Sequence, residues 1–111
     1  MNTPYDSPIL DATMNALSNQ KRRGIMHDLS LSPTTVSRLA KNHALSLPAI
    51  HKHMISLENA NLIIKKKIGR TNYVTLNLTT LGVLKNWIVQ YHTGWGNEYA
   101  TLENYISRMK E

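Results

Sequence analysis

Ser46-Leu-Pro-Ala-Ile-His-Lys-His-Met-Ile-Ser-Leu-Glu-Asn-Ala-Asn-Leu-Ile63 is the stretch around which the rest of this 111-residue chain is organised. Ser46 is a favourable helix N-cap because its hydroxyl accepts from free first-turn amides, and Pro48 stands where a missing N–H costs nothing. Apolar residues then recur at spacings of three and four along one stripe: Ile50, Met54, Leu57 and Ala60. This spacing predicts a helix of about four turns.

The opposite face of this helix is small, polar or basic, and carries Ala49, His51, Lys52 and Ser56. Asn61 follows at the point where a chain leaves a helix through the left-handed conformation, which Asn tolerates. A short helix with basic and polar side chains pointing away from the core near its N-terminus meets the requirements of a DNA recognition helix.

Two strands are expected directly after the helix, at residues 62–68 and 73–78, with Gly-Arg-Thr-Asn between them. In the second strand Val74, Leu76 and Leu78 alternate with polar neighbours, so one face is apolar. The pattern predicts a β-hairpin with a basic first strand and a basic tip, which would form a wing beside the recognition helix.

Three shorter helices are expected before it. The first begins near Ile9 after a loose lead-in at residues 1–8, the second spans residues 18–29 with Ser18 as its cap, and the third runs from a cap at Ser32 or Thr34 to about Lys41. A tight turn at residues 42–44 then joins the third helix to the recognition helix. The two helices therefore form a helix-turn-helix.

Three cations, Lys21, Arg22 and Arg23, fall in the first turns of the second helix. The positive end of the helix dipole disfavours them there. Either an external anion or an internal acid, Asp28 or Asp11, is expected to offset this conflict.

The C-terminal third carries an apolar surplus. A fifth helix, capped by Thr79 or Thr80, and a sixth segment ending near Lys110 contain five of the seven aromatic residues. A winged helix core is complete by about Leu78, so this surplus needs another surface to cover it. Two alternatives are a two-fold dimer made by the first and last helices, which we favour, and folding back of these helices onto their own domain.

The expected architecture is therefore a single winged helix-turn-helix domain, mainly α with a small β-hairpin, in the order α-α-α-α-β-β-α-α. Its expected parts are a flexible lead-in (1–8), a DNA-binding core (9–78) and C-terminal dimerisation helices (79–111). The expected dimer interface comprises Ile9, Leu10, Met14, Leu84, Trp87, Ile88, Tyr91, Trp95, Tyr99, Leu102, Tyr105 and Ile106.

Charge is distributed unevenly. The chain has a net charge of +6 and a pI of about 9.8. Between Lys21 and Arg70 the net charge is +8, and elsewhere it is −2. A basic field in one half favours a polyanionic partner, nucleic acid ahead of an anionic membrane, although a solvated basic surface is the competing interpretation.

The chain has no cysteine, so disulfides and thiolate metal sites are excluded. It has no apolar run long enough to span a membrane, and its first eight residues lack signal-peptide features, so a cytoplasmic protein is expected. The five His are scattered, and paired carboxylates or a glycine-rich phosphate loop are missing. We expect neither an enzyme nor a cofactor.

Several motifs together resemble the ArsR-type winged helix-turn-helix transcriptional repressors of bacteria and archaea. Residues 17–25 are similar to the Leu-x-x-x-x-Arg-x-x-Ile stretch of that family, and Thr35-Val-Ser-Arg-Leu-Ala40 is similar to its third helix. Residues 46–63 are similar to its recognition helix, usually Ser-x-x-x-Val-Ser-x-His-Leu-x-x-Leu-x-x-Ala-Gly-Leu-Val. The resemblance covers about residues 10–84 and implies a homodimeric DNA-binding regulator.

Two departures from the family pattern matter. His51 stands where the family commonly has Ser, so any DNA contact there changes in size and becomes sensitive to pH. The region of the family's Cys-x-Cys metal-sensing box reads Thr34-Thr-Val-Ser-Arg38, and the alternative metal site of the fifth helix lacks its ligands. No metal site is expected, and a small-molecule effector remains unassigned.

Candidate DNA contacts divide by role. Lysines and the glycine tip of the wing would follow the backbone or minor groove, Ser46 would anchor a phosphate, and Lys52 would donate to guanine while Ala49 meets a thymine methyl. His53 faces either a phosphate or the local backbone. The full expected set is Ser46, Leu47, Pro48, Ala49, His51, Lys52, His53, Ser56, Lys65, Lys66, Lys67, Gly69, Arg70, Thr71 and Asn72, with Lys21, Arg22 and Lys41 as weaker candidates.

Two functions follow from this pattern. The first is a homodimeric, sequence-specific regulator of transcription that binds double-stranded DNA. The second is a winged-helix module whose aromatic C-terminal helices bind a partner protein.

Overall fold

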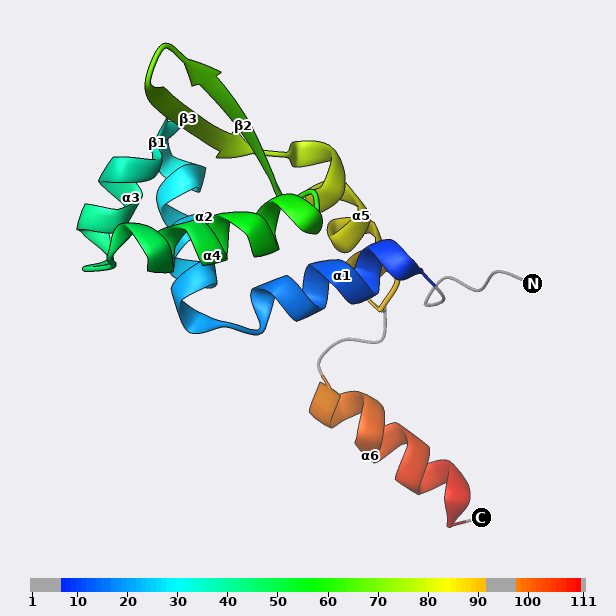
Figure 1. Ribbon diagram of the computed structural model, residues 1–111. Helices are drawn as coiled ribbons and strands as arrows, with labels where there is room; N and C mark the ends of the chain where they lie inside the picture. The colour runs from blue at the N-terminus through cyan, green and yellow to red at the C-terminus, as the bar shows by residue number, and fades with distance from the viewer. Residues whose placement is uncertain (1–6, 92–97, 111) are drawn as a thin grey trace.

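The computed structural model describes residues 7–91 and 98–110. The helices and strands follow the chain in this order: α1 (Pro8–Leu17), α2 (Gln20–Leu31), β1 (Thr34–Thr35), α3 (Val36–Asn42), α4 (Leu47–Asn59), β2 (Ile63–Ile68), β3 (Thr71–Leu76), α5 (Leu78–Val89) and α6 (Glu98–Met109). Figure 1 shows α1 to α4 gathered on one side of the sheet, with the β2–β3 hairpin projecting above them and α6 set apart. Over the described ranges, no helix is both long enough and apolar enough to cross a bilayer.

The recognition helix begins and ends as its sequence predicts. Ser46 is extended, and its Oγ accepts from the amide of Ala49 at 3.3 Å. At the other end Asn61 adopts a left-handed φ of 56°. The amide of Leu62 then donates to the carbonyl of Leu57 at 3.0 Å, which satisfies one of the last helical carbonyls.

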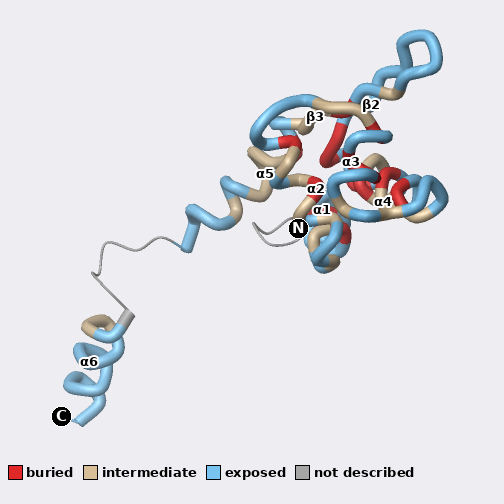
Figure 2. Tube along the Cα trace, turned by 90° about the vertical axis from the view of Figure 1, so that its left-hand side faces the viewer, coloured by how far each residue is buried: buried red, intermediate tan, exposed pale blue. Residues whose placement is uncertain are grey.

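The hydrophobic core is built around α4. The predicted stripe of Ile50, Met54 and Leu57 is fully buried, and Ala60 is buried with it. The stripe packs in one cluster with residues of α1, α2, α3, the sheet and the turn before β2, namely Ala16, Ile25, Leu29, Val36, Leu39, Ala40, Leu62, Ile63 and Val74. In Figure 2 the buried segments lie between these elements, while the hairpin tip and α6 are exposed.

The sheet has three strands, in the order β1-β3-β2, instead of the predicted two-stranded hairpin. Thr34 pairs with Val74 and Thr35 with Tyr73, so β1 covers the edge of β3 that a hairpin would leave open. The sequence had suggested Thr34, as an alternative to Ser32, as the cap of the third helix. Two residues are too few to show the alternating pattern that identifies a strand.

Several predicted caps are wrong by one to three residues. Asn19, Thr35 and Asn77 are the N-caps of α2, α3 and α5. Ser18 instead ends α1, where its hydroxyl donates to the Asn15 carbonyl at 2.6 Å. Ser, Thr and Asn serve similarly as caps, so their clustering leaves the helix start ambiguous in sequence.

The inward face of α1 differs from the stripe of Ile9, Leu10, Met14 and Leu17 that the spacing of apolar residues predicts. Its buried residues are Leu10, Thr13 and Ala16, whereas Ile9 and Met14 are exposed. The helix therefore presents an apolar edge that the described part of its own chain leaves uncovered.

Among the described residues, the arginines at the start of α2 donate to backbone carbonyls of α1, where the sequence suggested the internal acids Asp28 or Asp11. Arg22 Nε donates to the carbonyl of Ala16 at 2.6 Å, and Arg23 Nη1 donates to that of Leu17 at 2.8 Å. These carbonyls belong to the C-terminal end of α1, where the helix dipole favours positive charge. The two arginines thereby join α2 to α1.

A second set of contacts holds the helix-turn-helix turn against α2. Lys21 Nζ donates to the His43 carbonyl at 3.0 Å, and Nε2 of His43 lies 2.8 Å from Oδ2 of Asp28. The His43 ring lies against Gly24, where a Cβ atom would come within 3.0 Å of its Cε1. Position 24 therefore has no room for a side chain while the ring stays in place.

This contact gives a prediction about Gly24→Ala. Alanine is favoured over glycine inside a helix by about 1 kcal/mol, but in the wild-type chain the new methyl group meets a ring held by Asp28. We expect Gly24→Ala to give no stabilisation in the wild-type chain and to raise the free energy of unfolding by about 1 kcal/mol in a His43→Ala background. Urea denaturation of the four proteins measures both effects, and equal changes in the two backgrounds would contradict the packing argument.

Candidate nucleic-acid interface

The solvent face of α4 is a continuous stripe of exposed residues. It comprises Pro48, His51, Lys52, Ile55 and Asn59, directly opposite the buried stripe. The two basic or titratable groups expected to meet bases, His51 and Lys52, are therefore accessible. Ser46 and Leu47 extend the exposed surface to the start of the helix.

The other predicted base-facing residues lie on a flank of the helix. Ala49 and Ser56 are half-buried, and Ser56 lines a pocket of about 240 Å³ together with Asn15 of α1 and Arg22 of α2. The four-residue spacing from Lys52 placed Ser56 on the solvent face. The structure instead turns it toward α1.

Two residues of this face, Asn59 and Ile55, were missing from the predicted set, and the apolar one of the two is Ile55. Its side chain is 57% exposed, although it was expected neither in the core nor at the interface. Its spacing of four from His51 and three from Lys52 was a usable signal, because such neighbours share a helix face.

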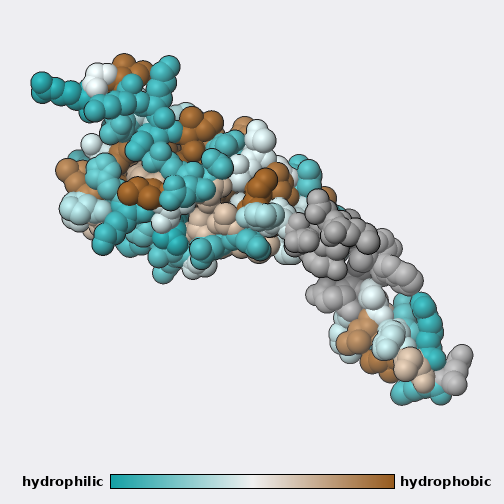
Figure 3. All heavy atoms as spheres, turned by 45° about the vertical axis from the view of Figure 1, so that its right-hand side comes forward, coloured by the Kyte–Doolittle hydropathy of each residue, from teal (hydrophilic) through white to brown (hydrophobic). Residues whose placement is uncertain are grey.

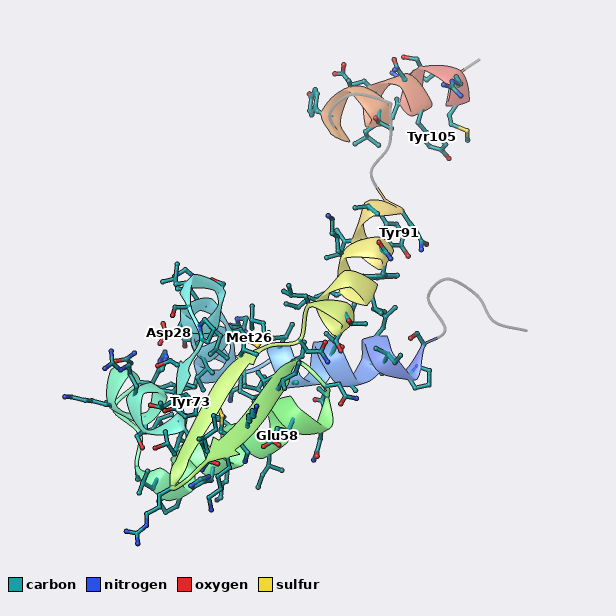
Figure 4. All side chains as sticks on the ribbon, turned by 90° about the horizontal axis from the view of Figure 1, so that it is seen from above. Met26, Asp28, Glu58, Tyr73, Tyr91 and Tyr105 are labelled. Atoms are coloured by element: carbon teal, nitrogen blue, oxygen red, sulfur yellow. The ribbon has the colours of Figure 1, made fainter. Side chains whose placement is uncertain are left out.

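The β2–β3 hairpin carries the basic wing. Lys65, Lys66 and Lys67 are exposed on β2, and alternate residues of a strand point to opposite faces. Lys65 lies on the face that carries Val74 and forms an ion pair with Glu58 of α4 at 3.0 Å. Figure 4 shows Glu58 on α4 beside the hairpin. This contact links the wing to the recognition helix.

The wing tip is a tight turn. Gly69 has a φ of 62°, and a Cβ placed on it would meet open space, so the backbone conformation alone favours glycine there. Arg70 and Thr71 are exposed beside it, whereas Asn72 is half-buried. The tip therefore places the exposed side chain of Arg70 beside a glycine with open space around it.

His53 lies near cations of α2. Nδ1 of the ring is buried and has no hydrogen-bond partner among the described residues. Burial lowers the pKa of His53 below its ordinary value, and the positive charges of Arg22 and Lys21 lower it further. The neutral imidazole is therefore favoured, which weakens the case for a charged phosphate contact from this side chain.

Eight of the twelve predicted dimer residues are exposed apolar or aromatic side chains of α1, α6 and the C-terminal end of α5. Ile9, Met14, Ile88, Tyr91, Tyr99, Leu102, Tyr105 and Ile106 are exposed, Leu84 and Trp87 are half-buried, Leu10 is buried in its own chain, and Trp95 lies outside the described residues. Trp87 and Tyr91 stack edge to face, with centroids 5.3 Å apart. Nε1 of Trp87 is buried and finds no acceptor among the described residues.

Helix α6 extends away from the rest of the chain. Figures 1 and 2 both show it apart from α1 to α5, and Figure 3 shows hydrophobic side chains gathered on its surface. The radius of gyration is 19.1 Å, against about 13 Å expected for a compact chain of this length. The exposed apolar and aromatic side chains of α6, called here the α6 stripe, are Tyr99, Leu102, Tyr105, Ile106 and Met109. This stripe is a surface that a partner can cover.

No metal centre is formed by the described residues, because no three His, Asp or Glu side chains among them come close enough to hold an ion.

The chain is similar to known regulators of transcription. It is 31% identical over 98 residues to the HTH-type transcriptional regulator Rv2034 of Mycobacterium tuberculosis, covering 88% of this chain and 90% of that protein. It is 28% identical over 82 residues to the transcriptional repressor SdpR of Bacillus subtilis, covering 74% and 91%. No family model matches the chain.

Solved structures share the fold. The crystal structure of an ArsR family transcriptional regulator superposes with a TM-score of 0.69 at 30% identity, covering 74% of this chain and 84% of the other. A homodimeric winged helix-turn-helix DNA-binding domain from Mycobacterium bovis superposes with a TM-score of 0.62 at 16% identity, covering 76% and 84%.

The environment of His53 predicts a pH dependence of stability. Its pKa is lowered in the folded state, so the unfolded chain binds the proton more strongly. Stability contributed by the neutral ring is present above about pH 6.5, is lost as the pH falls from there toward the folded-state pKa, and changes no further below it. For the titration of one group, the free energy of unfolding changes with pH by at most about 1.4 kcal/mol per pH unit.

Comparison with His53→Gln isolates this contribution, since Gln keeps polar atoms but does not titrate. The free energy of unfolding of the wild type minus that of the variant, measured by urea denaturation between pH 5 and 8, is expected to fall with decreasing pH. A difference independent of pH would show that His53 titrates as it does in the unfolded chain.

Proposed function

The chain belongs to the ArsR family of winged helix-turn-helix transcriptional regulators, and from this premise we propose that it is a homodimeric repressor binding a palindromic operator in double-stranded DNA. The observation that carries the proposal is the exposed, basic and polar face of α4 beside a basic wing. Family membership also favours this function over the protein-interaction module.

The recognition helix has the dimensions that a major groove accepts. Its 13 residues rise about 20 Å, and the groove, about 12 Å wide, admits one helix. Lys52 is exposed and can donate to O6 and N7 of guanine, and His51 offers ring nitrogens to the same edge. These two residues would supply base discrimination.

The wing would supply affinity. Lys66, Lys67 and Arg70 are exposed, so their charged groups are accessible to phosphates or the minor groove. Lys65 has a different role in this proposal, because its ion pair with Glu58 sets the position of the hairpin against α4. Ser46 and the amides at the start of α4 would anchor a further phosphate.

Dimerisation would pair two recognition helices about 34 Å apart, one helical turn of DNA. The exposed apolar side chains of α1, α5 and α6 are suited to this contact, because a second copy can bury them. A homodimeric winged-helix neighbour is consistent with such an assembly.

The direct test is fluorescence anisotropy of the full chain on duplex DNA from upstream of its own gene and on a shuffled duplex, each at several salt concentrations. Specific regulators bind their sites about 10³-fold or more tightly than other DNA. That preference is expected here. Equal affinities with the same steep salt dependence would mean that its operator lies elsewhere or that the protein binds DNA without sequence preference.

The assigned roles predict different outcomes for two lysines. Lys52→Ala is expected to weaken binding to the operator by about 10-fold or more and to leave shuffled DNA almost unchanged, because a base contact is lost. Lys66→Ala is expected to weaken both and to reduce the salt slope by about one unit, because a phosphate contact is lost. Lys85→Ala, an exposed lysine of α5, is the matched control. Equal losses on both duplexes for Lys52→Ala and Lys66→Ala would contradict the division of roles.

The proposed interface predicts that Leu102→Glu disrupts the dimer. The side chain is exposed on α6, so the charge costs little in a single chain but would be buried unpaired between two. Sedimentation velocity is expected to show a monomer and operator affinity to fall by at least about tenfold. Leu31→Glu on α2, also at an exposed leucine, should remain dimeric. A stable Leu102→Glu dimer would exclude α6 from the interface.

A further inference from the structure

Two large apolar side chains interrupt the polar face of the recognition helix. Leu47 is 58% exposed and Ile55 is 57% exposed. They stand four residues before and four residues after His51. The three side chains form one ridge along α4, called here the 47–51–55 ridge.

The spacing sets the dimensions of this ridge. Residues four apart on a helix are neighbours on one face, and each step rises about 6 Å. Leu47 and Ile55 are therefore separated by about 12 Å along the helix axis. Stacked base pairs in DNA rise about 3.4 Å, so this length spans three to four base pairs.

Folding does not require either apolar side chain. The buried stripe of α4 is already complete with Ile50, Met54 and Leu57, all fully buried. Neither Leu47 nor Ile55 belongs to the core cluster or packs against it. Isolated exposed apolar residues are common on protein surfaces, but these two share one row of the helix with His51, a residue of the proposed interface.

Charge indicates what covers this ridge. Lys52 is adjacent to it on α4, and exposed Lys66 and Lys67 lie on the wing. An apolar ridge within a basic surface fits a polyanion that also carries apolar groups. In the major groove the C5-methyl of thymine is the apolar group that base-pair edges present.

We propose that the 47–51–55 ridge reads thymine methyl groups at two positions of each operator half-site, three to four base pairs apart, through Leu47 and Ile55. This inference rests on the DNA-binding function proposed above. The sequence had assigned the contact with a thymine methyl group to Ala49. Because Ala49 is half-buried on the flank of α4, this proposal assigns that contact to Leu47 and Ile55 instead.

The experiment begins with selection of preferred sites from random duplexes by the full chain. Each thymine in the selected half-site is then replaced by deoxyuridine, which removes the methyl group and keeps base pairing. Two replacements at the proposed separation are expected to weaken wild-type binding by about fourfold each, the factor that corresponds to burial of one methyl group.

Variants assign each methyl group to its side chain. Ile55→Ala is expected to abolish the effect of uracil at one of the two positions and Leu47→Ala at the other. Ile64→Ala on β2 and Leu31→Ala on α2 are matched controls, since both residues are comparably or more exposed but lie outside α4. Both controls should retain the full uracil effect at both positions.

The possible outcomes distinguish failure of this inference from failure of the proposed DNA-binding function. A preferred site in which no uracil replacement weakens binding would overturn the ridge and leave the regulator function intact. Uracil effects that persist unchanged in both Ile55→Ala and Leu47→Ala would also overturn it, because the methyl groups would then act through DNA shape. Failure to select any preferred site would overturn the proposed function itself.

Discussion

The structure depends on one constraint, which is that α4 must be held by a single buried stripe while its opposite face remains free. Ile50, Met54 and Leu57 meet this constraint with full burial in a cluster drawn from α1, α2, α3 and the sheet. Because well-packed cores tolerate little displacement, the solvent face of α4 is positioned by its buried face. Precision at the proposed DNA surface is thus a consequence of packing.

Electrostatic contacts help to position the turn before α4 and the wing beside it. The short turn before α4 is joined to α2 through the backbone of His43 and the carboxylate of Asp28. The pair between Glu58 and Lys65 similarly ties the wing to α4. The Glu58–Lys65 pair joins the two elements of the proposed DNA surface, so the position of the wing relative to α4 is set before DNA binds. Preorganisation of this kind reduces the cost of ordering a binding surface.

The sequence predicted features whose cause is local. The stripe of α4, the cap at Ser46 and the left-handed Asn61 are confirmed because each depends on a few neighbouring residues. Features that depend on distant partners were missed. The strand at Thr34–Thr35 exists only through its pairing with β3, and the carbonyls that offset Arg22 and Arg23 belong to another helix. Periodicity likewise placed Ser56 on the solvent face, whereas the packing of α1 against α4 placed it on a flank.

The described part of the chain leaves two apolar surfaces exposed, and their surroundings differ. The α6 stripe and the edge of α1 are extensive and uncharged, which suits a second copy of the chain. The 47–51–55 ridge is narrow and surrounded by cations, which suits DNA. Dimerisation would fix the separation of two such ridges, and the methyl pattern would then be read at a set spacing in both half-sites. Specificity would then depend on the spacing of the two helices as well as on the side chains of each α4.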